Sequence, residues 1–423
     1  MVGFVTRMAA LHDDHSTPRE PLPPGFLRLI AAQFFSALAD NALLIVTIAL
    51  LQLQGSPLWW TPLLKFMATL SYVLLAPWVG PLADSVRKAR LMAWMNGLKI
   101  VALLGLLAGL PPLLCFGVLG CGAAAYAPAK YGLATELVAP HQLVRANAWI
   151  EVSVVCAVLL GTGLGGLLVS DMARQLMAGW FSPWMALPHA VWPALCALLV
   201  VYGAASALNI GLPDSGARYD RAARSMRRLF AEFWQANRVL WRDHDGGLSL
   251  AVTTLFWGVG AVLQFAVLRW AADVLHMPLS QGASLQAAVA VGVVLGAGLA
   301  GRWLALAHAR RVLPVGVPLG LLIAVASLVA QRWLALPMLA LVGAVGGVLV
   351  VPMNALLQHR GLQLLTAGRS IAVQNFNENL SMLAMLAAYA GLVALDVPID
   401  ALMRGLGAAV AALVLGLMWR TRR

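Results

Sequence analysis

Apolar blocks of about 20 residues repeat along almost the whole chain, separated by short polar connections. A block of this length spans the hydrocarbon core of a bilayer when it forms an α-helix. The pattern predicts an all-α membrane protein of about twelve transmembrane helices. The blocks lie near residues 27–52, 61–83, 91–110, 112–135, 145–169, 187–208, 248–272, 283–306, 312–331, 334–357, 370–395 and 399–419.

The longest polar connection divides these blocks six and six. It runs from about Pro213 to Gly247 and holds seven arginines and five acidic residues. Its mixture of arginines and apolar residues predicts an amphipathic helix on an anionic membrane surface. The predicted organisation is a disordered cytoplasmic tail at 1–25, a six-helix half at 26–210, a cytoplasmic linker at 211–247 and a second six-helix half at 248–423.

Sparse polar residues recur at one constant spacing. One offset that relates blocks of the first half to blocks of the second predicts two parallel, pseudo-symmetric halves, an architecture of the major facilitator type. A shift of 224 positions places Pro128 on Pro352, Lys130 on Asn354, Arg145 on Arg369, Glu151 on Asn375, Arg87 on Arg311 and Asp40 on Gln264.

Basic residues are concentrated in alternate connections, which predicts the orientation. Lysine and arginine are enriched in the cytoplasmic loops of membrane proteins. The opposite connections carry little beyond Arg174 and Arg332. We therefore predict a multi-pass protein with both termini in the cytoplasm. The basic residues on that side are Arg87, Lys88, Arg90, Arg145, Arg310, Arg311, Arg360, Arg369, Arg420, Arg422 and Arg423.

Composition narrows the class further. Apolar residues make up 61% of the chain and charged residues 11%, against about 25% charged in a soluble domain. The net charge is +12, but almost all the arginines lie between apolar blocks. They form no basic stripe interleaved with exposed aromatic residues, which excludes nucleic-acid binding. The cluster from His12 to His15 is better explained as solvated tail than as a metal site. We predict no metal and no cofactor.

Polar side chains inside the apolar blocks are the candidates for chemistry, because a charge there costs about 2.5–3.5 kcal/mol on insertion scales. Asp40 shares a helix face with Gln33, and Glu378 shares another with Gln374. Both stripes are expected to face a hydrated cavity, with structural contacts between helices as the alternative. Lys130 either meets a phosphate or extends to the membrane surface. The substrate-binding candidates are Gln33, Asp40, Asn41, Lys130, Glu151, Gln264, Asn354, Gln374 and Glu378.

The connection between the second and third blocks resembles the cytoplasmic loop motif of the major facilitator superfamily. It contains Gly80, Asp84 and the bases Arg87 and Arg90, but lacks the usual glycine between the bases. In that superfamily the aspartate helps to hold the inward ends of the halves together. We predict conformational or gating roles for Asp84, Arg87, Arg90 and the repeat-related Arg145 and Arg369.

Five segments resemble bacterial lysophospholipid transporters, in order and with similar spacing, from about Leu27 to the C-terminus. The resemblance implies transport of lysophosphatidylethanolamine and related lipids across the bacterial inner membrane to the cytoplasmic leaflet, where a separate acyltransferase restores the second acyl chain. In that family an arginine occupies the position of Gln264, and Lys130 is the residue expected to compensate. The segments are Ala32–Leu44, Tyr126–Gly132, Thr254–Gly258, Val351–Gln358 and Ile371–Asn375.

Two other functional classes are the alternatives. A proton-coupled exporter of drugs or amphipaths would share the fold, but the run from Gly161 to Gly166 lacks the proline of the glycine–proline pair usual in that class. A membrane-embedded acyltransferase would commonly need a histidine with an aspartate five positions later, and none of the eight histidines has one. A nucleophile elbow and a phosphate-binding loop are also missing from the sequence. We therefore predict a transporter rather than an enzyme.

Overall fold

A computed structural model describes residues 20–57, 60–173, 175, 191–217, 219, 225–277 and 279–421, so the cluster at His12–His15 lies outside the described residues. Within these ranges every regular element is a helix, which confirms the all-α class. The elements are α2 (Pro24–Leu53), α3 (Trp60–Leu74), α4 (Ala76–Ser85), α5 (Lys88–Leu107), α6 (Pro112–Leu137), η2 (Pro140–Gln142), α7 (Leu143–Leu168), α9 (Trp192–Ile210), α10 (Met226–Arg242), α11 (His244–Asp273), α12 (Leu279–Trp303), η3 (Leu306–Val315), α13 (Gly316–Ala326), α14 (Arg332–Leu364), α15 (Ala367–Ala394) and α16 (Ile399–Thr421).

The described helices account for the predicted membrane blocks. Ten of the candidate spans are long and apolar enough to cross a bilayer, and the bent pair α3–α4 supplies an eleventh. The pair bends by 66° at Leu75, just before Pro77, whose ring leaves no amide hydrogen for the helix. The 28-residue α15, which is not among these candidate spans, falls on the eleventh predicted block, 370–395, and the polar residues of its first half lower its mean hydropathy.

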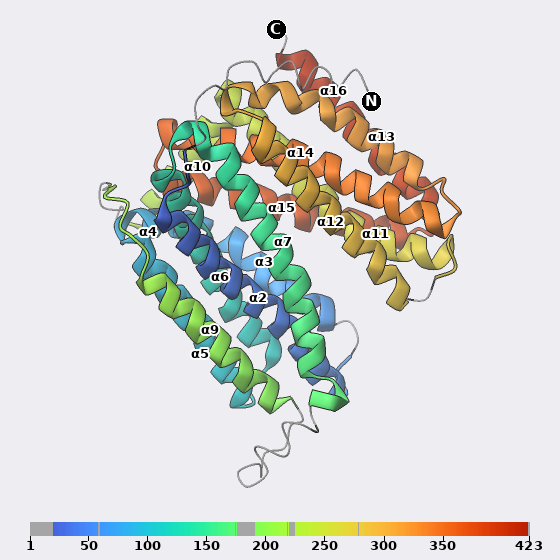
Figure 1. Cartoon of the computed structure of the whole chain (residues 1–423), viewed down its shortest axis with the longest axis horizontal. Coiled ribbons are helices and arrows are strands. Elements are labelled where there is room, and N and C mark those ends of the chain that lie inside the picture. Colours follow the sequence, from blue (N-terminus) through green and yellow to red (C-terminus); the bar gives the residue numbers. More distant parts are fainter. Residues whose placement is uncertain are drawn as a thin grey trace.

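The helices gather into two bundles that meet along a few elements (Figure 1). In the first bundle α2 packs on α7 and α5 packs on α6, and in the second α12 packs on α14 and α13 packs on α16. The bundles touch where α7 meets α12 and where α3 and α4 meet α15. Small residues allow close helix packing: a Cβ at Gly165 would lie 2.7 Å from the carbonyl oxygen of Ala42. Gly165 thus allows the backbones of α7 and α2 to approach closely.

The helix α10 lies at the end of the bundles where α4 joins α5 and α14 joins α15, and we call this the linker end. Asp243 connects α10 directly to α11 and accepts hydrogen bonds from Gly246 N at 2.7 Å and Arg360 Nη2 at 2.6 Å. The hydrogen bonds from Arg360 are the main reason that the pKa of Asp243 lies below its usual value. The resulting stabilisation is therefore present above the ordinary carboxyl pKa and is lost as the pH falls through the lowered pKa.

Candidate functional site

Asp40, near the middle of α2, is the centre of a buried polar cluster. Lys99 Nζ on α5 lies 2.6 Å from Asp40 Oδ2, and the hydroxyl of Tyr202 on α9 donates to Asp40 Oδ1 at 2.6 Å. The Lys99 side chain is 2% exposed and the Asp40 side chain 25%. Because a buried charge is stable only when it is paired, this ion pair fixes α2, α5 and α9 to one another. The sequence analysis missed Lys99, although a lone lysine inside an apolar block was the available signal.

The remaining polar residues of α2 serve contacts between helices. Ser36 accepts from Lys99 Nζ at 3.0 Å and donates to Asn96 Oδ1 at 2.8 Å. Gln33 is buried and donates to the carbonyl of Ile150 on α7 at 3.4 Å. The predicted cavity-facing stripe is therefore mostly packed against α5 and α7. The predicted site residue Asn41 donates to the carbonyl of Ala37 in its own helix.

Lys130 and Glu151 are ionisable side chains to which neighbouring side chains offer no hydrogen bond within the described ranges. Lys130, two residues after Pro128 on α6, places its ammonium 4.0 Å from the centre of the Tyr131 ring. Within the described ranges this ammonium donates no hydrogen bond, and the buried Glu151 on α7 accepts none. The two groups are close enough to interact electrostatically. A cation and a carboxylate without hydrogen-bond partners in the membrane interior are typical of a ligand site.

The second bundle contributes a facing set of polar groups on α14 and α15. Gln374 Nε2 donates to Glu378 Oε1 at 2.8 Å and to Asn354 Oδ1 at 3.0 Å. Glu378 lies within electrostatic range of Glu151 across the two bundles. The buried Gln374 Oε1 and Asn375 Nδ2 have no hydrogen-bond partner among the described residues. Buried polar atoms are almost always satisfied, so this group has spare capacity for a ligand or water.

Gln264 on α11 meets a cation from the first bundle. Lys65 Nζ on α3 donates to Gln264 Oε1 at 2.8 Å. On α12, Gln286 Nε2 donates to the Gln264 carbonyl at 2.6 Å. Lys65, rather than the expected Lys130, therefore places a positive charge beside Gln264. The sequence analysis did not select Lys65, because that prediction compared positions within one helix and Lys65 approaches from another.

At the linker end, Asp84 joins the two bundles. Its carboxylate accepts hydrogen bonds from the hydroxyl of Thr366 and from Gly368 N, the latter at 2.9 Å. The backbones of α4 and α15 are also close, because a Cβ at Gly368 would lie 2.5 Å from the Gly80 carbonyl oxygen. Asp84 thus connects α4 to α15, and its gating role stays a prediction.

Gln358 on α14 makes a second connection between the bundles. It exchanges two hydrogen bonds of 2.9 Å with the amide of Asn147 on α7, and Thr135 on α6 donates to it at 3.4 Å. All three residues are buried. A fully paired amide couple of this kind specifies how α7 and α14 face each other.

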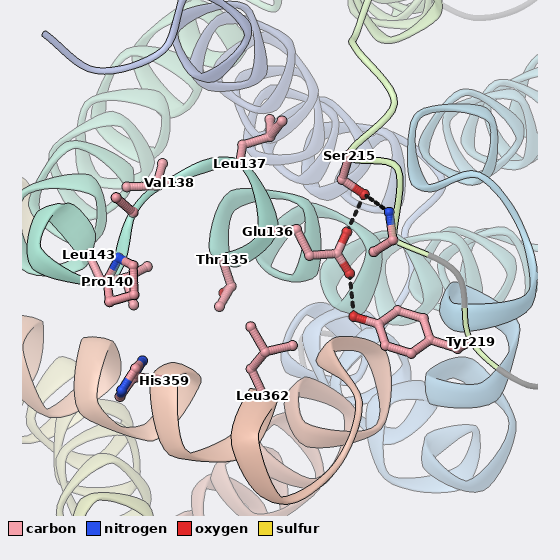
Figure 2. Close-up of a pocket in the computed structure, with 12 residues that line it drawn as sticks. Thr135, Glu136, Leu137, Val138, Pro140, Leu143, Ser215, Tyr219, His359 and Leu362 are labelled. Atoms are coloured by element: carbon pink, nitrogen blue, oxygen red, sulfur yellow. Dashed lines mark hydrogen bonds between the residues drawn. The ribbon is translucent and has the colours of Figure 1, made fainter.

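Glu136 is the centre of a cluster that we call the latch, formed by Lys88, Glu136, Ser215 and Tyr219. Lys88 Nζ lies 2.7 Å from Glu136 Oε1, and both side chains are 5% exposed. The hydroxyls of Ser215 and Tyr219 donate to the same carboxylate at 2.5 and 2.8 Å (Figure 2). Burial, followed by the bond to Glu136, raises the pKa of Tyr219. The segment after α9 is thereby attached to α5 and α6.

A pocket of about 560 Å³ lies beside the latch, at the linker end rather than among the central charges (Figure 2). The first bundle contributes Glu136 and Pro140 to its lining, and α14 contributes His359 and Leu362. The pocket therefore lies between the bundles, next to the groups that hold them together.

The predicted gating arginines are distributed around the linker end. Arg369 Nη2 lies 2.9 Å from Glu232 Oε2 on α10, and Arg87 Nε lies 3.1 Å from Asp214 Oδ2. Arg145 donates to the carbonyl of Glu20 at 3.1 Å. Arg90 makes no ion pair or hydrogen bond in the part of the chain that the structure describes. The structure therefore brings Arg87 and Arg369 into ion pairs, and it does not bring Arg90 to Asp84.

Comparison with known proteins identifies the family. The model of the Major Facilitator Superfamily matches residues 29–386. The lysophospholipid transporter LplT of Yersinia enterocolitica serotype O:8 is 40% identical over 90% of both chains. The protein of the same name in Yersinia pestis (strain Pestoides F) is 40% identical over 90% of this chain and 89% of its own length. The chain belongs to the lysophospholipid transporter family of the major facilitator superfamily.

Solved structures of more distant transporters share the fold. A bacterial homologue of the iron transporter ferroportin, in an outward-facing state, aligns with a TM-score of 0.70 at 16% identity, covering 95% of this chain and 100% of its own. The fucose:proton symporter FucP of E. coli aligns with a TM-score of 0.71 at 13% identity, covering 94% and 98%. The predicted major facilitator fold and the multi-pass membrane class are therefore confirmed.

Proposed function

We propose that this protein moves lysophospholipids, lysophosphatidylethanolamine and related lipids, across the bacterial inner membrane to the cytoplasmic leaflet. The 40% identity to transporters of that name supports the substrate class. The observation that carries the proposal is the unpaired Lys130 ammonium in electrostatic range of Glu151, which in turn faces Glu378. A lysophosphatidylethanolamine headgroup has an anionic phosphate and a cationic ammonium, and this arrangement offers one partner for each.

In this proposal Lys130 receives the phosphate, because a charge-assisted hydrogen bond to phosphate is strong. Glu151 and Glu378 receive the ammonium, and the free amide atoms of Gln374 and Asn375 bind the glycerol and phosphate oxygens. Asp40 does not contact the headgroup in this proposal; its ion pair with Lys99 holds α2 and α5 in place beside the site. The single acyl chain remains in lipid between the bundles, so the protein encloses only the headgroup.

The proposed orientation places the linker end in the cytoplasm, together with both termini. The connections at this end carry the basic residues, as in cytoplasmic loops generally. The Asp84 bonds and the Asn147–Gln358 pair, which join the two bundles, then hold the cytoplasmic side closed. Alternating access follows when the two bundles rock about the central charges and these contacts open.

The proposed partner is a separate acyltransferase on the cytoplasmic side, which would consume the delivered lipid. We propose that the chain itself transports without catalysing a reaction. The transporter names of the two relatives that match 90% of the chain support this division of work.

The test is a flipping assay with the full chain in liposomes. Lysophosphatidylethanolamine labelled on its acyl chain would be removed from the outer leaflet by albumin, with diacyl phosphatidylethanolamine as the comparison lipid. We expect protein-dependent flipping of the lyso form only. Lys130→Gln should slow it at least about tenfold, because a hydrogen bond to a charged group contributes about 1.5–3 kcal/mol.

The matched control is Arg404→Gln, which removes an exposed cation that pairs with Asp400 on α16 and should leave the rate unchanged. A pH gradient across the membrane tests coupling in the same assay. If folded, inserted protein does not flip the lyso lipid, the proposal is wrong. Gradient-driven transport of other amphipaths would then favour the exporter class.

A further inference from the structure

Helix α10 spans the two bundles at the linker end through aromatic contacts. Phe230 meets Trp78 of α4 edge-on, with ring centres 5.0 Å apart. Phe233, which is buried, meets Phe376 of α15 in the same way at 5.2 Å. Helix α10, which is not among the candidate membrane spans, therefore touches both bundles at the linker end.

A stripe of aromatic side chains next to this buried face is left uncovered. Phe230, Trp234 and Trp241 are 42%, 53% and 37% exposed. Trp241 donates its indole N–H to Asn377 of α15 at 3.1 Å, whereas the Trp234 indole has no hydrogen-bond partner among the described residues. Tryptophan placed in this manner is characteristic of the membrane interface, where an apolar ring and a polar N–H are both accommodated.

Beside the aromatic stripe lies a face of arginines. At 3.6 residues per turn, Arg227, Arg238 and Arg242 fall within about 60° of one another, and Trp234 lies about 20° from Arg227. All three arginines are exposed, and they make no ion pair or hydrogen bond with the described part of the chain. Arg228, in contrast, pairs with Glu232 at 3.4 Å.

We propose that this face of α10 is a binding surface for anionic phospholipid headgroups. The arginines would contact phosphates while Trp234 and Phe230 insert at the boundary of the acyl chains. The position of α10 supports lipid as the ligand, because α10 is joined through the single residue Asp243 to the membrane span α11. The charge of the face also favours an anionic surface, because its three arginines have no ion pair among the described residues and each would strengthen binding about fivefold (~1 kcal/mol).

The consequence is regulatory. Since α10 touches both α4 and α15, bound anionic lipid would hold α10 across the two bundles and stabilise the closed linker end. The surface is separate from the central charges, so it depends on membrane composition rather than on the transported lipid.

The experiment is hydrogen–deuterium exchange of peptides covering residues 226–242, in full-length protein in nanodiscs of phosphatidylcholine with or without about one third phosphatidylglycerol. We expect exchange to slow about five- to tenfold in the anionic bilayer, and high salt to remove the difference. The triple variant Arg227→Gln, Arg238→Gln, Arg242→Gln should lose the effect.

The matched control changes the same three arginines to lysine, which keeps the charge and should retain the protection. Thermal unfolding of both triple variants in detergent should match the wild type, because the three exposed side chains make no ion pair or hydrogen bond with the described residues. Equal exchange in the two bilayers, or protection that survives the glutamine substitutions, would overturn the proposal. The exchange readout does not require transport, so it is independent of the flipping assay.

Discussion

The linker end and the bundle centre treat their charges in opposite ways. At the linker end the carboxylates of Asp84, Glu136 and Asp243 are each satisfied by several donors. At the centre, Lys130 and Glu151 lie within electrostatic range but have no hydrogen-bond partner in the described chain. Both regions are costly to desolvate, so the difference reflects what each region does. The hydrogen-bonded carboxylates at the linker end stabilise one conformation, and the central groups without hydrogen-bond partners are available to a ligand.

The Asp40–Lys99 pair combines features of both regions. It lies at the bundle centre, but its charges are paired and hydrogen-bonded, as at the linker end. It stabilises one bundle internally rather than joining two bundles or waiting for a substrate. Its neighbours Ser36 and Tyr202 complete the cluster. This contrast suggests separate tests for structure, closure and binding.

The largest expected effect on stability comes from breaking the Asp40–Lys99 pair. Asp40→Asn leaves the Lys99 ammonium buried without a counter-charge, which should cost about 3 kcal/mol and lower the unfolding temperature in detergent. The double variant Asp40→Leu, Lys99→Met removes both charges and should be markedly more stable than the single variant. An Asp40→Asn protein as stable as the wild type would show that the pair is not structural.

A smaller effect on stability is expected from weakening the hydrogen bonds that Asp84 accepts between the two bundles. Asp84→Asn loses part of the acceptor set for Thr366 and Gly368, which should weaken closure by about 1–2 kcal/mol and speed hydrogen exchange where α14 joins α15. The control, Asp396→Asn, makes the same chemical change between α15 and α16. If exchange at the α14–α15 connection were equal in both variants, the gating role of Asp84 would have to be abandoned.

Each hydroxyl of the latch should contribute less free energy than the Asp84 hydrogen bonds. Ser215→Ala with Tyr219→Phe removes two hydroxyl donors from Glu136 while Lys88 still pairs with it, so the expected loss is about 1 kcal/mol. The measurement is the rate of trypsin cleavage between α9 and α10, which should increase severalfold. Ser170→Ala, which removes a hydroxyl at the end of α7, is the control. Unchanged cleavage would mean that the latch does not restrain this segment.

The smallest effect is expected for an exposed pair. Arg269 and Asp273 lie one helical turn apart on α11 with an N–O distance of 3.2 Å. Such pairs contribute about 0.3–0.5 kcal/mol, so Arg269→Gln should leave the unfolding temperature and the flipping rate almost unchanged. A large loss of transport in this variant would place the substrate path along α11 rather than between Lys130 and Glu378.

The sequence was sufficient to predict the all-α fold because bilayer thickness imposes a block length that needs no knowledge of neighbours. Asp84, Asn354, Gln374 and Glu378 could also be selected, because polar residues inside or beside apolar blocks are few. The amphipathic linker helix was predicted from the mixture of arginines and apolar residues in that connection, and α10 lies within it.

The partners of these residues could not be predicted, since they depend on how helices far apart in sequence pack. Lys99 and Asp40 are 59 residues apart, and Lys65 and Gln264 are 199 apart. Helical spacing relates residues only within one helix, so it placed Gln33 toward a cavity when α7 in fact covers it. The roles of Lys65 and of the latch required three-dimensional contacts.

The most direct test of the central claim is the affinity of the purified protein for lysophosphatidylethanolamine, measured by equilibrium binding for the wild type and Lys130→Gln. An ammonium left unpaired for a ligand predicts binding at least about tenfold weaker in the variant, with an unchanged unfolding temperature. Equal affinity would contradict the claim. A loss of affinity accompanied by a large loss of stability would contradict it as well, because Lys130 would then be serving the fold.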